Sequence, residues 1–111
     1  MPRDHSLYLE DIRDAAEQIQ VYVEGLEYDQ FIADQRTADA VVRNLEIIGE
    51  AVKRLPPEVT DAREDVDWSR IAGLRDILIH AYFKVDLEMV WDIIKNKLPS
   101  LQDAVTGLLR E

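Results

Sequence analysis

The chain has 111 residues, 23 acidic and 13 basic, so its formal net charge at neutral pH is −10. This length predicts a single domain over residues 1–111, and a hydrophobic content of 47% excludes a disordered chain. The absence of cysteine excludes a disulfide scaffold, thiol catalysis and cysteine-ligated metals. The sequence contains no apolar run of roughly 20 residues and no signal-peptide pattern at its acidic start, so we expect a cytoplasmic protein without a membrane partner.

Apolar residues recur at three- and four-residue steps, as in amphipathic helices. We predict a first helix from about residue 4 to 26, with Asp4 or Ser6 as its N-cap and Gly25 near its end. Its apolar stripe consists of Leu7, Ile12, Ala15, Ala16, Ile19, Val23 and Leu26. A connector over residues 27–36, anchored by Phe31, should follow.

A second helix is predicted from about residue 37 to 55, ending at the Pro56-Pro57 pair. One sector of this helix carries the residues expected in the core, which are Val41, Leu45, Ile48, Val52 and Leu55. Asn44 interrupts the apolar arc, either as a core amide with satisfied hydrogen bonds or as the wall of an active groove. The arc is wider than one small bundle can cover, so we predict a homodimer.

The second half of the chain continues the helical pattern after a polar surface segment, residues 58–67. A third helix should start near Trp68 or Ser69, with Asp67 as cap, and run to about Tyr82. A fourth begins after Asp86, and Pro99 predicts a kink or break before a fifth segment over residues 101–109. The fold class is therefore all-α, an up-and-down bundle of four to five helices.

Four polar residues of the third helix could carry chemistry, namely Arg75, Asp76, His80 and Tyr82. At 100° per residue they share a sector of about 160°, opposite the apolar stripe. Arginine offers a fork of donors for a phosphate, histidine can act as general acid or base, and Asp76 can orient the imidazole. The structural alternative is an ordinary solvated helix face without catalysis.

The pattern Arg75-x4-His80-x-Tyr82 resembles the signature of the HepT-like family within the HEPN superfamily. The blocks RTADAVVRNLEIIGEAVKRLP (36–56) and DWSRIAGLRDILIHAYFKVDLEMVW (67–91) also resemble that family. The resemblance implies an all-helical homodimer that acts as the toxin of a type VII toxin–antitoxin system. It further implies a metal-independent endoribonuclease without a cofactor, in which Arg75 and His80 are catalytic.

The same resemblance implies a partner, a minimal nucleotidyltransferase antitoxin called MntA. This enzyme would neutralise the toxin by transferring AMP to the tyrosine of the motif, here Tyr82. Asp76 would support His80, and Lys84 and Asn44 are candidates for the wall of the RNA groove. The high negative charge favours a different function, a non-catalytic helical module that binds and regulates a nucleotidyltransferase.

Other residues are assigned structural roles. Glu46 and Glu50 are four residues apart, but the chain lacks the Glu-x-x-His pairs of carboxylate-bridged metal bundles, so no metal site is predicted. We expect Glu50 to face water or to pair with Arg43, Lys53 or Arg54. Trp68 and Trp91 are expected in the core or in dimer contacts.

Overall fold

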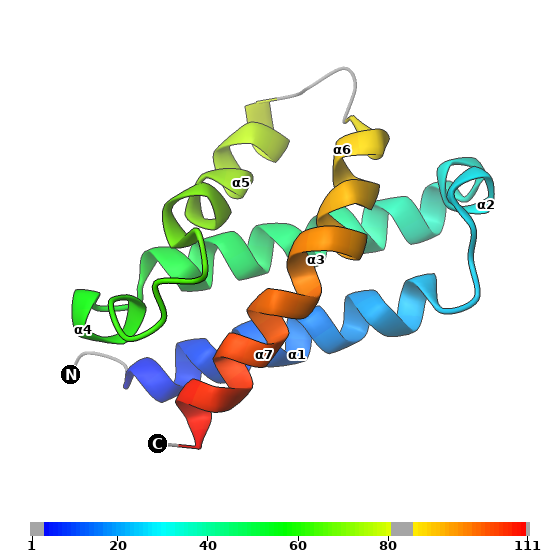
Figure 1. The fold of residues 1–111 in the computed structure, drawn as a ribbon. Helices are drawn as coiled ribbons and strands as arrows, with labels where there is room; N and C mark the ends of the chain where they lie inside the picture. The colour runs from blue at the N-terminus through cyan, green and yellow to red at the C-terminus, as the bar shows by residue number, and fades with distance from the viewer. Residues whose placement is uncertain (1–3, 81–85, 111) are drawn as a thin grey trace.

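The computed structural model describes residues 4–80 and 86–110, and for residues 75–80 it describes the course of the backbone alone. All regular elements of the described residues are helices and none is a strand, which confirms the all-α prediction (Figure 1). Its elements are α1 (His5–Val23), α2 (Tyr28–Ala33), α3 (Gln35–Lys53), α4 (Pro57–Thr60), α5 (Trp68–His80), α6 (Leu87–Asp92), the π-turn η1 (Ile93–Lys97) and α7 (Leu98–Leu109).

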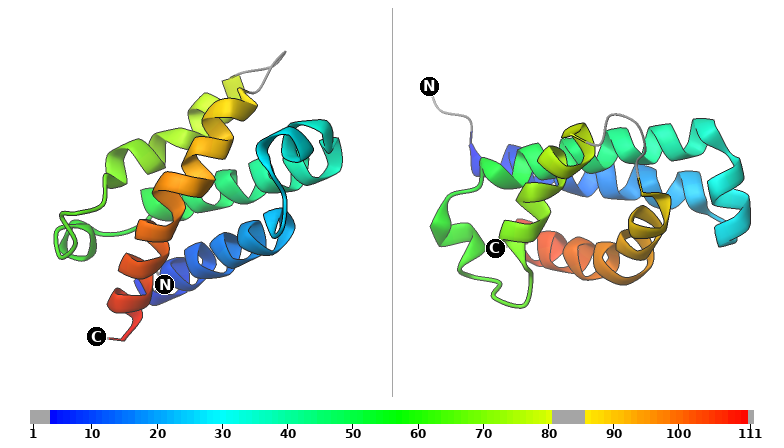
Figure 2. Two further views of the ribbon diagram at one scale, coloured as in Figure 1. Left: turned by 45° about the vertical axis from the view of Figure 1, so that its right-hand side comes forward. Right: turned by 90° about the horizontal axis from the view of Figure 1, so that it is seen from above.

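Two long helices, α1 and α3, run side by side and form the base of the bundle (Figures 1 and 2). The segments α6, η1 and α7 follow one another as one continuous rod that crosses this pair, and α7 packs on α1. Helix α5 packs chiefly against α3. The helix that carries the candidate motif is thus supported by α3, on the side of the bundle away from α1.

The core confirms the predicted stripe of the second helix, since Val41, Leu45, Ile48, Val52 and Leu55 are all buried. In α1 the prediction for Leu7 is wrong, because its side chain is 40% exposed whereas Leu9 is buried. Leu9 lies three residues before Ile12 and shares its helix face, while Leu7 lies five residues before it and does not.

Aspartates begin several helices, as the sequence predicts. The Asp4 carboxylate accepts a hydrogen bond from Ser6 N at 3.0 Å, and Gly25 lies just beyond the end of α1 with a φ of +77°. Asp34 accepts bonds from Thr37 N at 3.1 Å and from Thr37 Oγ1 at 2.7 Å. This cap starts α3 at Gln35, earlier than predicted.

Two short helices lie in the segments that the sequence analysis treated as connections, and α4 fits the short turn allowed for residues 58–67. The connector over residues 27–36 contains the short helix α2, and the polar segment 58–67 overlaps α4, which starts at Pro57. Phe31 is fully buried, so its predicted role as an anchor is confirmed. Helix α3 ends at Lys53, slightly before the proline pair.

Pro99 does not break the rod, because the preceding π-turn accommodates it. Leu98 N donates to Ile93 O, five residues earlier, which is the bond of a π-turn. Pro99 then falls in the first turn of α7, directly after the wider π-turn, so its missing N–H removes a single bond at the junction of the two helix types. The expected interruption is therefore a change of helix type within one rod.

Candidate functional site

Helix α5 is fixed at its start by a cap and a buried indole. Asp67 Oδ1 accepts from Arg70 N at 3.2 Å, which confirms the predicted cap. The Trp68 side chain is buried, and its Nε1 donates to Arg63 O at 2.9 Å. These contacts set where α5 begins and hold its first turn against the preceding segment.

The last two turns of α5 contain three of the predicted site residues, Arg75, Asp76 and His80. They lie on one helix, as the sequence predicts, and this helix packs on α3. Tyr82 and Lys84, predicted as the modification site and as part of the groove wall, lie outside the described residues. Their roles remain predictions.

Asn44 lies on α3, the helix against which α5 packs, and its side chain is half-buried. Its Nδ2 donates to Ala40 O one turn earlier, at 2.9 Å. This bond pairs one N–H of the amide within its own helix, while the side chain lies at the edge of the core rather than inside it. A further role of Asn44 as a wall of the active groove remains a prediction.

Arg63 joins the segment before α5 to the C-terminal helix, a connection that the sequence analysis missed. Its Nε and Nη2 donate to the two carboxylate oxygens of Asp65, both at 2.9 Å, and Nη2 lies 3.5 Å from Asp103 Oδ2 on α7. The hydrogen bonds from Arg63 lower the pKa of Asp65, and they raise that of Arg63. No pattern in the sequence indicates this contact, because its two ends are 40 residues apart, at positions 63 and 103.

A cavity of about 490 Å³ lies between α5 and the α6–η1–α7 rod. The residues that line it come from the start of α5 and from one face of the rod: Asp65, Val66, Asp67, Arg70, Ile71, Leu74, Met89, Asp92, Ile93, Asn96, Lys97, Ser100 and Leu101. Sequence reasoning missed this cavity, since its existence depends on how the two helices diverge in space.

An aromatic cluster fixes α2 against the rod. The Trp91 ring lies 5.1 Å from that of Phe31 and 6.1 Å from that of Tyr28, measured between centroids. Lys95 Nζ lies 4.6 Å from the centroid of the Trp91 ring, a cation–π contact. Trp68 is therefore a core residue, and the half-buried Trp91 packs against the core. The dimer contacts that the sequence also allowed for these tryptophans remain a prediction.

The described residues contain no group of three or more histidine, aspartate or glutamate side chains that could hold a metal ion. Glu50 Oε1 accepts from Arg54 Nη2 at 3.0 Å, one of the predicted pairings. The helices in the described ranges are all too short or too polar to cross a bilayer.

Comparison with known proteins identifies the family. The HepT-like family, described as "Ribonuclease HepT-like", matches residues 12–108. A protein of Thermococcus cleftensis named "Probable ribonuclease HepT" is 42% identical over 102 residues, which cover 92% of this chain and 93% of that protein. A protein of Caldanaerobacter subterraneus named "Putative RNase TTE0752" is 41% identical over 94% of this chain and 93% of its own length.

A third relative is a longer protein. It comes from Methanocaldococcus jannaschii, is named "Gamma-glutamylcyclotransferase and putative RNase MJ0434", and is 37% identical over the whole of this chain but only 50% of its own length. No solved structure matches the chain significantly. The family match and the two full-length relatives are decisive: the chain belongs to the HepT-like ribonuclease family, within the HEPN superfamily.

Proposed function

We propose that this protein is an endoribonuclease that acts as the toxin of a HepT/MntA toxin–antitoxin system. The observation that carries the proposal is the motif Arg75-x4-His80-x-Tyr82, which falls inside the region matched by the HepT-like family. The names of the two full-length relatives describe them as a ribonuclease and an RNase, which supports the proposed activity. Placement of Arg75 and His80 on one helix gives the two groups a common rigid support.

The proposed reaction uses the substrate's own nucleophile. The 2′-oxygen of RNA attacks the neighbouring phosphorus, the bond from phosphorus to the 5′-oxygen breaks, and a 2′,3′-cyclic phosphate forms. His80 serves in proton transfer, with the proton of the 2′-hydroxyl ending on the departing 5′-oxygen, and Arg75 stabilises the charge on the phosphate. Asp76 orients or stabilises the imidazole, and Asn44 and Lys84 lie along the groove.

The proposed regulation acts on Tyr82. A cognate nucleotidyltransferase would transfer AMP to the Tyr82 hydroxyl, releasing pyrophosphate from ATP. Tyr82 and Arg75 are seven residues apart, two turns of an ideal helix, so an attached phosphate would compete with RNA for the arginine. We also propose that the active form is a homodimer, in which a second copy of the motif adds basic groups to an acidic chain.

The alternative function is a non-catalytic module that binds and regulates the nucleotidyltransferase. The net charge of −10 favours it, because a surface that binds RNA must offset the charge of the phosphates. The two functions differ in what Arg75 and His80 contribute. A scaffold tolerates their loss, whereas an endoribonuclease does not.

Induced expression separates these two functions. Growth and the integrity of cellular RNA are followed for the wild type, Arg75→Ala, His80→Ala and the control Arg13→Ala. Arg13 is a partly exposed arginine of α1 that pairs with its neighbour Asp14. We expect growth arrest and RNA cleavage with the wild type and the control, and neither with the two motif variants. Equal behaviour of all four proteins would favour the scaffold.

A further inference from the structure

The cavity beside α5 has the character of a site for an organic group. Its walls include Ile71 and Leu74 from α5 and Ile93 and Leu101 from the rod. Its volume of about 490 Å³ lies within the range of pockets that hold small organic ligands. Such pockets combine apolar walls with a few polar groups at defined places, and the rim of this cavity has such groups.

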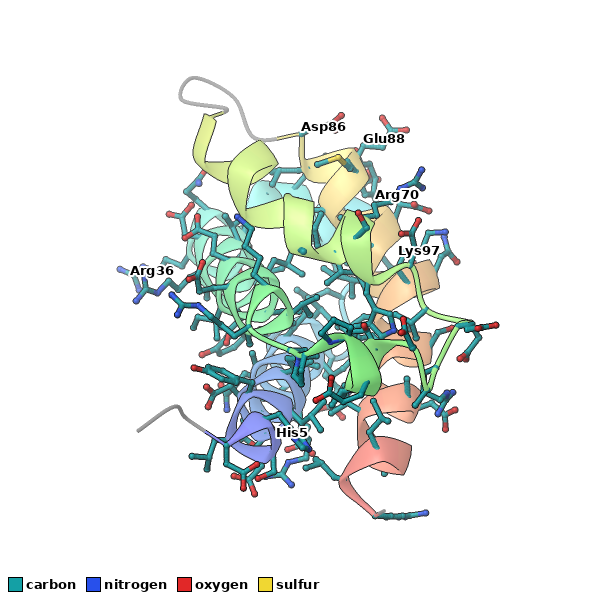
Figure 3. The ribbon with its side chains drawn as sticks, turned by 90° about the vertical axis from the view of Figure 1, so that its left-hand side faces the viewer. His5, Arg36, Arg70, Asp86, Glu88 and Lys97 are labelled. Carbon is teal, nitrogen blue, oxygen red and sulfur yellow. The ribbon has the colours of Figure 1, made fainter. Side chains whose placement is uncertain are left out.

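Two cations line the cavity, one from each side. Arg70 belongs to α5 and Lys97 to the end of η1. Figure 3 shows both side chains at the same edge of the molecule, with Arg36 at the opposite edge. The Arg70 side chain is 75% exposed, and its Nε lies 3.7 Å from Asp67 Oδ2. Lys97 has no carboxylate partner within the described part of the chain, so its ammonium group is available to an anion.

The three carboxylates of the cavity are already engaged by donors. Asp65 accepts both hydrogen bonds of the Arg63 fork, Asp67 accepts from Arg70 N, and Asp92 accepts from Asn96 Nδ2 at 2.6 Å. The lining itself has two cations, Arg70 and Lys97, against these three acids, so its formal charge is −1. A chain with a net charge of −10 therefore offers, at this cavity, a place where the local charge is nearly neutral.

The cavity adjoins the motif along α5. Among the residues of α5 whose side chains are described, Leu74 is the last that lines it, and Arg75 follows directly in the chain. Ile71, another residue of the lining, lies one turn before Arg75 on the same side of α5, whereas Arg70 lies about 7.5 Å from Arg75 along the helix axis and about 140° around it. A strand that places a phosphate near the motif can therefore reach the cavity with a neighbouring nucleotide.

We propose that this cavity binds one unstacked base of a single-stranded RNA substrate, while Arg70 and Lys97 contact the phosphates beside that base. This inference rests on the proposed ribonuclease function and specifies how the substrate is held. Single-stranded RNA exposes its bases, which bind in apolar pockets and on rings, while the backbone follows cationic side chains. The apolar walls take the base, and the two cations offset the phosphates in an otherwise acidic protein.

The test measures binding separately from cleavage. The full chain is titrated against a short fluorescent oligoribonucleotide of mixed sequence with 2′-O-methyl riboses, which cannot undergo attack by the 2′-oxygen. Anisotropy gives the affinity over a series of salt concentrations. The variants are Arg70→Ala, Lys97→Ala and Ser100→Trp, in which an exposed residue of the cavity rim is enlarged to fill the space.

The chain offers a matched control for each cation. Lys95 lies two residues before Lys97 in the same π-turn but sits over Trp91, away from the cavity lining. Arg36 is an exposed arginine at the opposite edge in Figure 3. Lys95→Ala and Arg36→Ala remove the same charges as the two test variants, and the proposal expects them to bind the probe like the wild type.

The proposal expects distinct signatures from the test variants. Loss of one phosphate contact lowers the slope of log affinity against log salt by about 0.7, so Arg70→Ala and Lys97→Ala should each show this change. Ser100→Trp should weaken binding and leave the slope unchanged, because it removes space for a base and no charge. The same preparations are assayed on unmodified RNA. Binding with these signatures but without cleavage would contradict the proposed ribonuclease and leave this inference standing.

Several results would overturn the inference. One is a wild type that does not bind the probe, and another is an equal loss of slope in Lys95→Ala and Lys97→Ala. A third is a Ser100→Trp variant that binds RNA like the wild type but self-associates differently in analytical ultracentrifugation. That result would mean that a second copy of the chain occupies the cavity. AMP and an unlabelled oligonucleotide are also compared as competitors of the probe. If AMP displaces the probe at a much lower concentration than the oligonucleotide does, the cavity is a mononucleotide site instead.

Discussion

Arg63 and Asp103 meet across the boundary between the segment before α5 and the C-terminal helix, with Arg63 Nη2 3.5 Å from Asp103 Oδ2. Gly107, one turn further along α7, makes room for the same guanidinium. A Cβ at this glycine would lie 3.1 Å from Arg63 Nη1, closer than ordinary contact. The absence of a side chain at Gly107 thus lets Arg63 lie against α7 while it holds Asp65.

This arrangement predicts a coupling between Arg63 and Gly107. An alanine within a helix is favoured over glycine by about 1 kcal/mol, so Gly107→Ala should stabilise α7 if space permits. In the wild type the gain should be smaller, because the new methyl group must displace Arg63. In the Arg63→Ala background the full gain should appear. Urea unfolding of the four proteins in a double-mutant cycle measures the difference, and identical gains in both backgrounds would disprove the coupling.

Phe31 should be a large contributor to stability although α2 has only six residues. Its ring is fully buried and lies 5.1 Å from that of Trp91. Phe31→Ala should lower the free energy of unfolding by about 3–5 kcal/mol, the usual cost of removing a buried aromatic ring. The neighbouring Ile32 is 40% exposed and provides the control, since Ile32→Ala should cost far less. Similar costs for the two variants would mean that α2 is not anchored by Phe31.

The cap of α3 predicts a loss of stability in acid. Hydrogen bonds from the Thr37 side chain and backbone lower the pKa of Asp34, so its stabilising contribution is complete above the ordinary aspartate value of about 3.9. The contribution is lost as the pH falls through the lower pKa of the folded state. Asp34→Asn keeps an N-cap that does not titrate, so its melting temperature should fall less between pH 5 and pH 2 than that of the wild type. Parallel curves for the two proteins would exclude this role.

RNA cleavage should not depend on a divalent metal ion. The proposed reaction uses only Arg75, His80 and the 2′-hydroxyl, so the rate in EDTA should equal the rate in magnesium. Asp76→Asn should weaken cleavage without abolishing it, because a residue that orients the histidine contributes less than the histidine itself. Initial rates on a fluorescent RNA substrate measure both effects. Activity that EDTA removes and magnesium restores would contradict the mechanism.

The proposed modification of Tyr82 can be detected by mass spectrometry. When the chain is co-expressed with its neighbouring nucleotidyltransferase, its intact mass should increase by one or more AMP units, and peptide mapping should place them on Tyr82. Tyr82→Phe should remain unmodified and toxic in the presence of the partner. A wild type that is neutralised without any added mass would show that the partner acts by forming a complex.

Local signals in the sequence predicted the long helices and their caps. The spacing of Val41, Leu45 and Ile48 indicates the buried face of α3, and Asp67 and Asp86 mark the starts of α5 and α6. The short helix α2 was missed, because six residues give too little periodicity to recognise a helix. Its stability combines a local contact, in which Glu27 N donates to Gln30 Oε1 at 2.8 Å, with the tertiary contacts of Phe31.

For the candidate site, the sequence was sufficient to place Arg75, Asp76 and His80 on one helix. It gave no indication of the Arg63 contacts or of the cavity beside Leu74. Both features lie between the α6–η1–α7 rod and the part of the chain around the start of α5, and the relative position of such segments depends on packing over the whole core. Helical periodicity describes only one helix at a time.

The π-turn also bears on how chain length can vary in this family. A bond from Leu98 N to Ile93 O encloses one residue more than an α-helical turn does, so residues 93–97 contain one residue that a regular helix would not need. Deleting one residue there would convert the turn to α-helix and would place Pro99 inside a continuous α-helix, where its ring meets the carbonyl four residues earlier. A chain that is one residue shorter at this point should therefore form the same rod only where it also lacks the proline.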